Sequence, residues 1–265
     1  MPNKLAEARQ ELALANAIVA NEGVIDAFGH VSMRVPGHPD RYLLSRSRAP
    51  ELVTANDFIE YDLESRPLRD PQVGQYSERV IHGEIYKARP EVMAVCHHHC
   101  PAFMPLLATG TDYVPIFHLG AIGGSNPPFW DQRDEFGDTN MLVVKPEEGA
   151  SLARALGQHW MVLMKRHGVT VAGTSVRDCV FRCIYSARNA EYQVRAMTIG
   201  TVAALSQGET ELAGQITGKT TGLTRSWEYW SMRVAKAGGT RPAVKKTGRR
   251  RPAAKKAKRA ARRHR

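Results

Sequence analysis

The run His97-His98-His99 contains the residues of this sequence best suited to chemistry. It ends an apolar, β-branched segment, residues 92–99, whose composition predicts a strand. Because alternate side chains of a strand point to the same face, His97 and His99 should converge while His98 points away. Two imidazoles on one strand face can begin a divalent-metal site, although a metal-free histidine cluster also fits these residues taken alone.

A catalytic metal needs a further ligand from elsewhere and an open position for substrate. His167 lies between two apolar segments and could turn toward the first pair, although a lone histidine there is more often structural. Cys96 and Cys100 flank the histidine run, so a zinc site that includes a cysteine is an alternative. It is disfavoured because Cys96 faces away from His97 and His99.

Helices and strands are mixed without strict alternation, which predicts one α/β domain with a mixed or mainly antiparallel sheet between helical layers. Apolar periodicity and breakers predict helices at 5–22, 77–89, 101–109, 148–157, 175–200 and 226–238. The predicted strands are 30–35 and 41–47, one after a turn or helix start in 54–65, one in 92–99, one that leads into a glycine-rich loop in 114–124, and a strand–turn–strand unit over 160–173. Residues 125–140 are expected to form a long polar loop of the kind that borders active sites.

The sequence resembles the class II aldolase/adducin family over roughly residues 5–235. Several blocks carry the resemblance in the right order: Gly29-His30-Val31-Ser32-x-Arg34, Ser77-Glu78-x3-His82-x3-Tyr86-x2-Arg89-Pro90, Ala94-Val95-x-His97-x-His99-x-Pro101, His167-Gly168 and Gly173.

The resemblance implies a three-layer α/β/α domain around a mainly antiparallel sheet, and a tetramer with active sites at subunit interfaces. It implies that His97, His99 and His167 bind one divalent ion per subunit (zinc, manganese or iron), and that Glu78 moves protons beside it. A carboxylate next to a cation can act as a general acid or base. Glu78 also suits the start of a helix, where the dipole favours negative charge, so its spacing does not separate the two roles.

The sequence departs from the family's sugar-phosphate aldolases where small side chains cradle a phosphate. His30, Ser47-Arg48 and Tyr76-Ser77 stand at those positions, and the larger side chains Arg48 and Tyr76 would partly fill the phosphate cup. A smaller, flatter anion is expected instead, with substrate-binding residues drawn from His30, Arg46, Ser47, Arg48 and Ser77.

Arg46 and Arg48 carry planar guanidinium groups that could bind a carboxylate through two hydrogen bonds, although a solvated arginine loop is the alternative. These blocks, together with Phe117-His118, resemble the decarboxylase branch of the family, which acts on hydroxylated pyridine- or benzene-dicarboxylates. His118 could be a second acid/base or could bond a ring hydroxyl, and a structural histidine is equally compatible.

The leading hypothesis is therefore metal-dependent decarboxylation of an aromatic ortho-hydroxy carboxylate, with Glu78 or His118 protonating the ring carbon. Alternatives are a retro-aldol lyase acting on a (phospho)sugar or hydroxy-keto acid, a non-haem iron oxygenase that decarboxylates a hydroxyphenyl acid oxidatively, and a non-catalytic, adducin-like binding protein. The last predicts missing ligands, whereas all three histidines and Glu78 are present.

The net charge of +11 is concentrated at one end of the chain. Residues 241–265 hold 13 basic and no acidic side chains, so the rest has 37 − 13 = 24 basic against 26 acidic side chains, about −2. We expect a catalytic domain over residues 1–240 and a disordered basic tail over 241–265 that could contact polyanions. The absence of a membrane-spanning segment or signal sequence and the four scattered cysteines are typical of a cytoplasmic protein with reduced thiols.

Overall fold

The computed structural model describes residues 2–238 and is built on a seven-stranded sheet in the order β3-β2-β1-β4-β7-β6-β5. Neighbouring strands are antiparallel except β5 and β6, which are parallel. The strands are β1 (His30–Val35), β2 (His38–Ser45), β3 (Phe58–Asp62), β4 (Ala94–His98), β5 (Phe129–Trp130), β6 (Met161–Met164) and β7 (Gly168–Gly173). The predicted basic tail, 241–265, lies outside the described residues.

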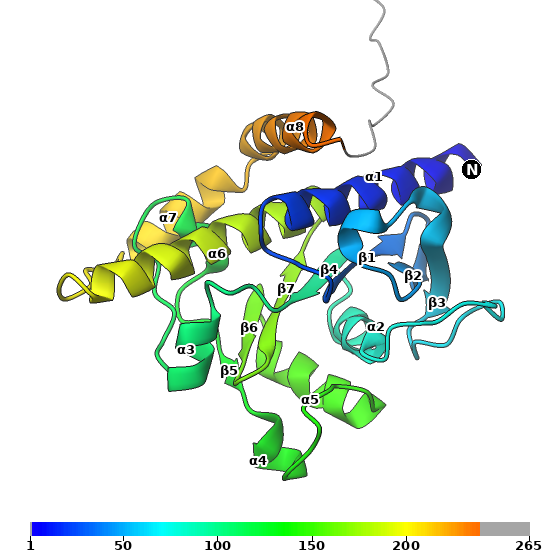
Figure 1. Cartoon of the computed structure of the whole chain (residues 1–265). Coiled ribbons are helices and arrows are strands. Elements are labelled where there is room, and N and C mark those ends of the chain that lie inside the picture. The colour runs from blue at the N-terminus through cyan, green and yellow to red at the C-terminus, as the bar shows by residue number, and fades with distance from the viewer. Residues whose placement is uncertain (1, 239–265) are drawn as a thin grey trace, which may run out of the picture.

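Helices cover both faces of the sheet, which confirms the predicted three-layer α/β/α arrangement (Figure 1). One layer holds α1 (Pro2–Asn21) and α6 (Val176–Met197), against which α8 (Thr220–Lys236) packs. The opposite layer holds α2 (Arg79–Ala88) and α5 (Pro146–Leu156). The shorter helices are α3 (Met104–Thr109), α4 (Gln132–Phe136) and α7 (Gln207–Thr217), and the 3-10 turns are η1 (Pro50–Leu52), η2 (Ala55–Asp57) and η3 (Gly120–Gly123).

The three central strands, β1, β4 and β7, carry different chemistry on their two faces. Toward α1 and α6 they present apolar residues of one core, among them Val31, Cys96 and Val171. On the other face, strand pairing sets His30 opposite His97 and His97 opposite Thr170, so that three polar residues form a row across the sheet. The period of two along each strand therefore separates the main core from the face that carries the site.

Most predicted elements are confirmed, but two expectations about local structure were wrong and one helix was missed. Residues 114–118 form no strand, because the side chains of Gln193 and Asn189 on α6 bond the backbone N–H groups of Val114 and Ile116. The expected loop 125–140 contains the short elements β5 and α4. Helix α7 was not predicted, and its sequence is largely polar and exposed.

All four cysteines are free and buried. No helix among residues 2–238 is long and apolar enough to cross a membrane.

Arg34 on β1 ties the sheet to the end of α2 through a buried guanidinium. Its Nη2 donates to the carbonyl oxygens of Tyr86 at 2.9 Å and Arg89 at 3.3 Å, and its Nε donates to the carbonyl oxygen of Val92 at 3.2 Å. The guanidinium carbon lies 4.7 Å from the centre of the Tyr86 ring. Arg34 thus holds α2 against β1, the two elements that carry most of the groups around His30.

Arg34→Lys should lower the free energy of unfolding by about 2–4 kcal/mol, because an ammonium group cannot replace the fork of donors and leaves buried carbonyls unpaired. Urea unfolding followed by circular dichroism measures the change. The matched control is Arg41→Lys on β2, where the side chain is part-exposed and pairs with Asp40 at 3.6 Å. Equal midpoints for the two variants would contradict the role given to Arg34.

Candidate metal centre

Three imidazoles and one carboxylate converge at the end of β4. One ligand atom from each of Glu78, His97, His99 and His167 lies within 4.8 Å of the other three. His97 Nε2 is 3.2 Å from His99 Nε2, and the Glu78 carboxylate is 3.8 Å from His97 Nε2 and 3.5 Å from His167 Nε2. The predicted convergence of His97 and His99 on one side of the strand is therefore confirmed.

The ligands are held by three different local structures. His97 lies on β4 and His99 follows it directly, whereas His167 lies in the tight turn that joins β6 to β7. Arg166, the residue before it, has a positive φ of 59°, and its Nη2 lies 2.8 Å from both carboxylate oxygens of Asp131. This ion pair fixes the turn that presents His167 to the other two histidines.

Glu78 occupies the N-cap position of α2, but its side chain makes no capping hydrogen bond. Instead, its Oε1 accepts a hydrogen bond from the backbone N–H of Val143 at 3.0 Å, which aims the carboxylate at the histidines. Glu78 thus belongs to the cluster while it also lies at the start of α2, so its position satisfies both roles that spacing alone could not separate.

The donor set fits a divalent transition-metal ion. Zinc–nitrogen bonds of about 2.0–2.1 Å in tetrahedral geometry place two nitrogens about 3.3 Å apart, close to the His97–His99 separation. His97 Nδ1 lies 3.1 Å from Thr170 Oγ1, whose hydroxyl donates to Met164 Sδ at 3.4 Å. Thr170 therefore accepts a hydrogen bond from His97 Nδ1–H, which leaves the lone pair of His97 Nε2 directed at the cluster.

Burial keeps the histidines neutral, as metal ligation requires. Burial and, after it, the neighbouring imidazoles together lower the pKa of His97 well below the usual range and that of His167 to about 4. Burial has the opposite effect on the carboxylate and raises the pKa of Glu78 to about 7, despite the bond from Val143. Without an ion, Glu78 is therefore poised to take up or release a proton near neutral pH.

The profile of the class II aldolase and adducin N-terminal domain matches residues 10–194. This chain belongs to that family. A decarboxylase of Talaromyces stipitatus, tropJ, is 31% identical over 244 residues, covering 84% of this chain and 91% of that protein. A 3,4-dihydroxyphthalate decarboxylase of Arthrobacter keyseri is 28% identical, covering 80% and 82%.

Solved structures agree with this assignment at the level of the fold. An aldolase II superfamily protein from Pseudomonas syringae superposes with a TM-score of 0.75 at 21% identity, covering 89% of this chain and 94% of that one. Membership of the class II aldolase family, together with the decarboxylase names of the two sequence relatives, supports a lyase. The cluster described above is where such chemistry would need its ion.

In this class II aldolase fold, His30 and Tyr76 form a wall beside the ligands. The His30 ring centre lies 5.4 Å from that of His97 and 4.6 Å from that of Tyr76. The Tyr76 hydroxyl bonds the main chain of Arg48, whose N–H lies 3.4 Å away. An aromatic ring and an arginine thus occupy the place predicted for a filled phosphate cup. Ser47 and Ser77, also predicted to bind substrate, lie exposed on the neighbouring loops.

Arg46 and Arg48 are both engaged by one carboxylate that the sequence analysis did not single out. Arg46 Nε lies 2.6 Å and Arg48 Nη1 3.1 Å from Asp57, which is 8% exposed. Burial raises the pKa of Asp57, but bonds from Arg46, Thr54 and Arg48 outweigh this and hold it well below its usual range. Two cations against one anion leave a net positive loop, so carboxylate binding by these arginines stays a prediction.

Two other predicted groups lie away from the cluster. His118 is exposed and lines a different pocket, with Phe181, Tyr185 and residues of α7 and α8. His98 points to the opposite face of β4, as expected, and its ring lies 5.9 Å from that of Phe103. Neither Cys96 nor Cys100 belongs to the cluster among the described residues, so the cysteine-containing alternative gains no support.

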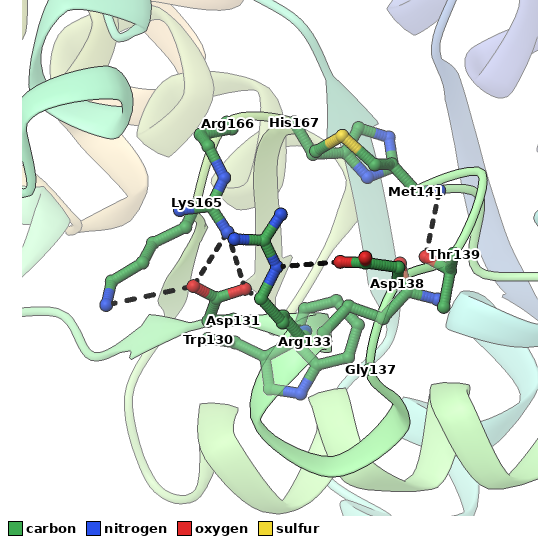
Figure 2. A pocket seen from close by; sticks show the side chains of 11 residues that line it. Trp130, Asp131, Arg133, Gly137, Asp138, Thr139, Met141, Lys165, Arg166 and His167 are labelled. Atoms are coloured by element: carbon green, nitrogen blue, oxygen red, sulfur yellow. Dashed lines mark hydrogen bonds and ion pairs between the residues drawn. The ribbon is translucent and has the colours of Figure 1, made fainter.

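A pocket of about 290 Å³ opens beside His167 (Figure 2). Its lining includes Lys165 and Arg166, both directed at Asp131, and Arg133, which pairs with Asp138 at 3.3 Å. Three cations against two carboxylates give this approach to the metal centre a net positive charge.

Sequence reasoning assigned no role to Thr170, Val143 or His82. His82 is four residues after Glu78 in the predicted helix, so the two side chains share one helix face. That spacing could have indicated that His82 lies near the site. Thr170 and Val143 gave no such signal, because their roles depend on strand register and on a distant loop.

Gly168→Ala should lower metal affinity by about ten- to a hundredfold, as loss of ligand alignment does at metal sites. A Cβ there would lie 2.5 Å from the carbonyl oxygen of His98, 2.8 Å from the His99 ring and 3.3 Å from the His97 ring. Zinc affinity measured by competition with a chelating dye tests this. Gly208→Ala in α7, where a Cβ meets nothing within 4 Å, is the control and should bind normally.

The metal-free protein should gain stability as pH rises from about 4 to 6.5. The folded chain excludes protons from His30 and His98, each with a pKa of about 3, and from His167, whereas the unfolded histidines bind them below pH 6.5. Each contributes about 1.4 kcal/mol per pH unit in that window. Glu78 lowers stability as pH rises, because its pKa rises from 4.5 to about 7 on folding, but the three histidines together contribute more.

Unfolding of chelator-treated protein by urea at several pH values measures the slope. Adding zinc should raise the melting temperature at pH 7.5, because the ion binds the folded site. A flat or falling profile between pH 4 and 6.5 would contradict the neutral, buried histidines.

Proposed function

We propose that this class II aldolase family member is a divalent-metal-dependent lyase that decarboxylates a hydroxylated aromatic carboxylate. The observation that carries the proposal is the Glu78–His97–His99–His167 cluster, in which three neutral imidazoles stand beside a carboxyl group with a pKa near 7. The names of two relatives, a decarboxylase and a 3,4-dihydroxyphthalate decarboxylase, support the choice of reaction.

His97, His99 and His167 would hold the ion, with Glu78 as a fourth group within reach. When bound, a zinc, manganese or iron ion supplies Lewis-acid stabilisation of negative charge that develops on the substrate. The Thr170 bond to His97 and the Asp131–Arg166 pair behind His167 keep the ligands oriented.

The chemical step needs one proton. As carbon dioxide leaves, the electron pair of the broken C–C bond stays on the ring carbon, and a proton must replace the lost carboxyl carbon there. Glu78 is the acid placed for this step, because its carboxyl group lies within 3.8 Å of His97 Nε2 and 3.5 Å of His167 Nε2, beside any substrate bound at the cluster. The proton moves from the Glu78 carboxyl to the ring carbon, and the carboxylate is then reprotonated from solvent.

The walls of the site favour a flat anion over a sugar phosphate. Tyr76 lies against His30 and bonds the main chain of Arg48, so an aromatic surface stands where a phosphate cup would need small groups. A flat ring can pack on Tyr76 while the net positive loops around Asp57 and Asp131 attract its carboxylates. Retro-aldol cleavage of a phosphorylated sugar remains the second candidate, supported by the family alone.

The assembly is also part of the proposal. A homotetramer would let His118, which lies away from the cluster within one chain, approach the site of a neighbouring subunit as a second acid/base. The catalytic domain would span residues 1–240 of a cytoplasmic enzyme.

Glu78→Gln should retain the ion and lower kcat for carbon dioxide release by about 10²–10⁴, because the amide keeps the shape but carries no transferable proton. His97→Ala should lose both ion and turnover. Glu135→Gln, whose carboxylate bonds Ser151 and Arg154, is the matched control and should stay active. Elemental analysis and carbon dioxide release are measured on a panel of hydroxyaryl carboxylates, with and without oxygen.

The same panel separates the alternatives. Activity that requires and consumes oxygen identifies an oxygenase, and cleavage confined to sugar phosphates or hydroxy-keto acids identifies a retro-aldol lyase. A metal-free His97→Ala variant with full activity would overturn the proposal, and so would a fully active Glu78→Gln variant.

A further inference from the structure

Four buried side chains form a continuous hydrogen-bonded chain that begins beside the metal ligands, here called the His30–Tyr86 chain. His30 Nδ1 lies 2.6 Å from His82 Nε2, His82 Nδ1 lies 2.6 Å from Ser32 Oγ, and Ser32 Oγ lies 2.7 Å from the Tyr86 hydroxyl. The four residues are at most 2% exposed. A chain of short bonds in such a dry environment is strongly ordered, because an unpaired polar group there is costly.

Two simple spacings build the His30–Tyr86 chain. His30 and Ser32 are two residues apart on β1 and face the same side of the sheet, whereas His82 and Tyr86 are four apart on one face of α2. The His82 ring thus sits between β1 and α2 and reaches both strand residues. Arg34, which bonds the Tyr86 carbonyl, holds the two elements together at the far end.

The Tyr86 end of the chain sets the donor and acceptor of each hydrogen bond. Among residues 2–238, Ser32 Oγ is the only hydrogen-bond acceptor for the Tyr86 hydroxyl, so the tyrosine must donate to it. The phenol keeps its proton, since burial raises the pKa of Tyr86 beyond any ordinary range. Ser32 has then accepted one bond and directs its own proton to His82 Nδ1.

The orientation of the Ser32 hydrogen bond determines the tautomers of both imidazoles. Neither ring is doubly protonated, because His82 accepts the Ser32 bond at Nδ1 and His30 Nδ1 faces His82 Nε2 across a single hydrogen bond. A neutral imidazole that accepts at Nδ1 carries its proton at Nε2. His82 Nε2–H therefore donates to His30 Nδ1, and His30 in turn carries its proton at Nε2.

That last N–H has no acceptor among the described residues. It belongs to a ring packed against the ring of His97. A donor without a protein partner within residues 2–238, on a ring packed against His97, is suited to an oxygen atom that arrives with a ligand. The opposite direction of the chain would present a lone pair there, which would repel such an oxygen.

We infer that His82, Ser32 and Tyr86 are positioning residues that hold His30 in its Nε2–H tautomer, so that this N–H donates to an anionic oxygen of the substrate beside the metal ligands. The inference rests on the proposed function only for the identity of that oxygen. The tautomer itself is a property of the ligand-free protein, and it makes the site a receptor for a hydrogen-bond acceptor, such as a carboxylate, at this position.

The test is a direct observation of the ring protons. Two-bond ¹H–¹⁵N correlation spectra of the full chain, labelled with ¹⁵N-histidine and loaded with zinc, distinguish the two neutral tautomers of each ring. The His30 signals are assigned by their absence in His30→Asn. We expect a single tautomer for both His30 and His82, with the proton on Nε2; a wild-type His30 that carries its proton on Nδ1 overturns the inference, whatever any variant does.

Ser32→Ala removes the hydroxyl that donates to His82 Nδ1, so nothing then fixes the tautomers of His82 and His30. His30 should then populate both tautomers, and the affinity for 2-hydroxybenzoate, used as an anionic probe, should fall by about five- to tenfold, the weight of one hydrogen bond. Ser186→Ala, which removes a buried hydroxyl from α6 in the other layer, is the control and should change neither quantity. An unchanged tautomer in a folded, zinc-loaded Ser32→Ala variant also overturns the inference.

Failure here and failure of the proposed reaction give different results. If the protein shows the expected tautomer but releases no carbon dioxide from any hydroxyaryl carboxylate, the His30 inference stands and the proposed decarboxylation is wrong. If the protein decarboxylates but His30 is protonated on Nδ1, the proposed reaction stands and the positioning role of the chain is wrong.

Discussion

The burial of His97 and the partial burial of His99 and His167 at one end of β4 are together the constraint on which the rest of the structure depends. Buried imidazoles cannot hold a proton, so they stay neutral and keep a lone pair available for an ion. The same dry surroundings push the carboxyl group of Glu78 the other way, toward its protonated form. One physical cause thus prepares both the ligands and the acid.

Such burial favours partners for the remaining polar atoms, and the central strands supply one for His97 through Thr170. The row His30–His97–Thr170 exists because β1, β4 and β7 are neighbours in a fixed register. A slip of one residue in either pairing would turn these side chains into the apolar core beneath α1 and α6. The main core therefore fixes the register, and the register in turn fixes which polar atoms meet at the site.

The sequence allowed the nearest-neighbour part of this site to be predicted. Alternation along a strand was enough for His97 and His99, and the order of family blocks added His167 and Glu78. The contacts of His30 with His82 and of His97 with Thr170 depend on the register of segments 50 or more residues apart, which spacing along the chain does not contain. Residues 114–118 look like a strand because they are apolar, yet side-chain amides on α6 take the backbone bonds that a strand would need.

The groups that would hold an ion and the groups that would shape the substrate come from different kinds of structure. The first belong to the sheet, a tight hairpin turn and the start of α2, whereas Arg46 and Tyr76 lie on loops and Arg133 lies on the short helix α4. Loop side chains can be exchanged at small cost to folding, but strand residues in a packed register cannot. This scaffold could therefore acquire new substrates in small steps that never interrupt its capacity to bind the metal.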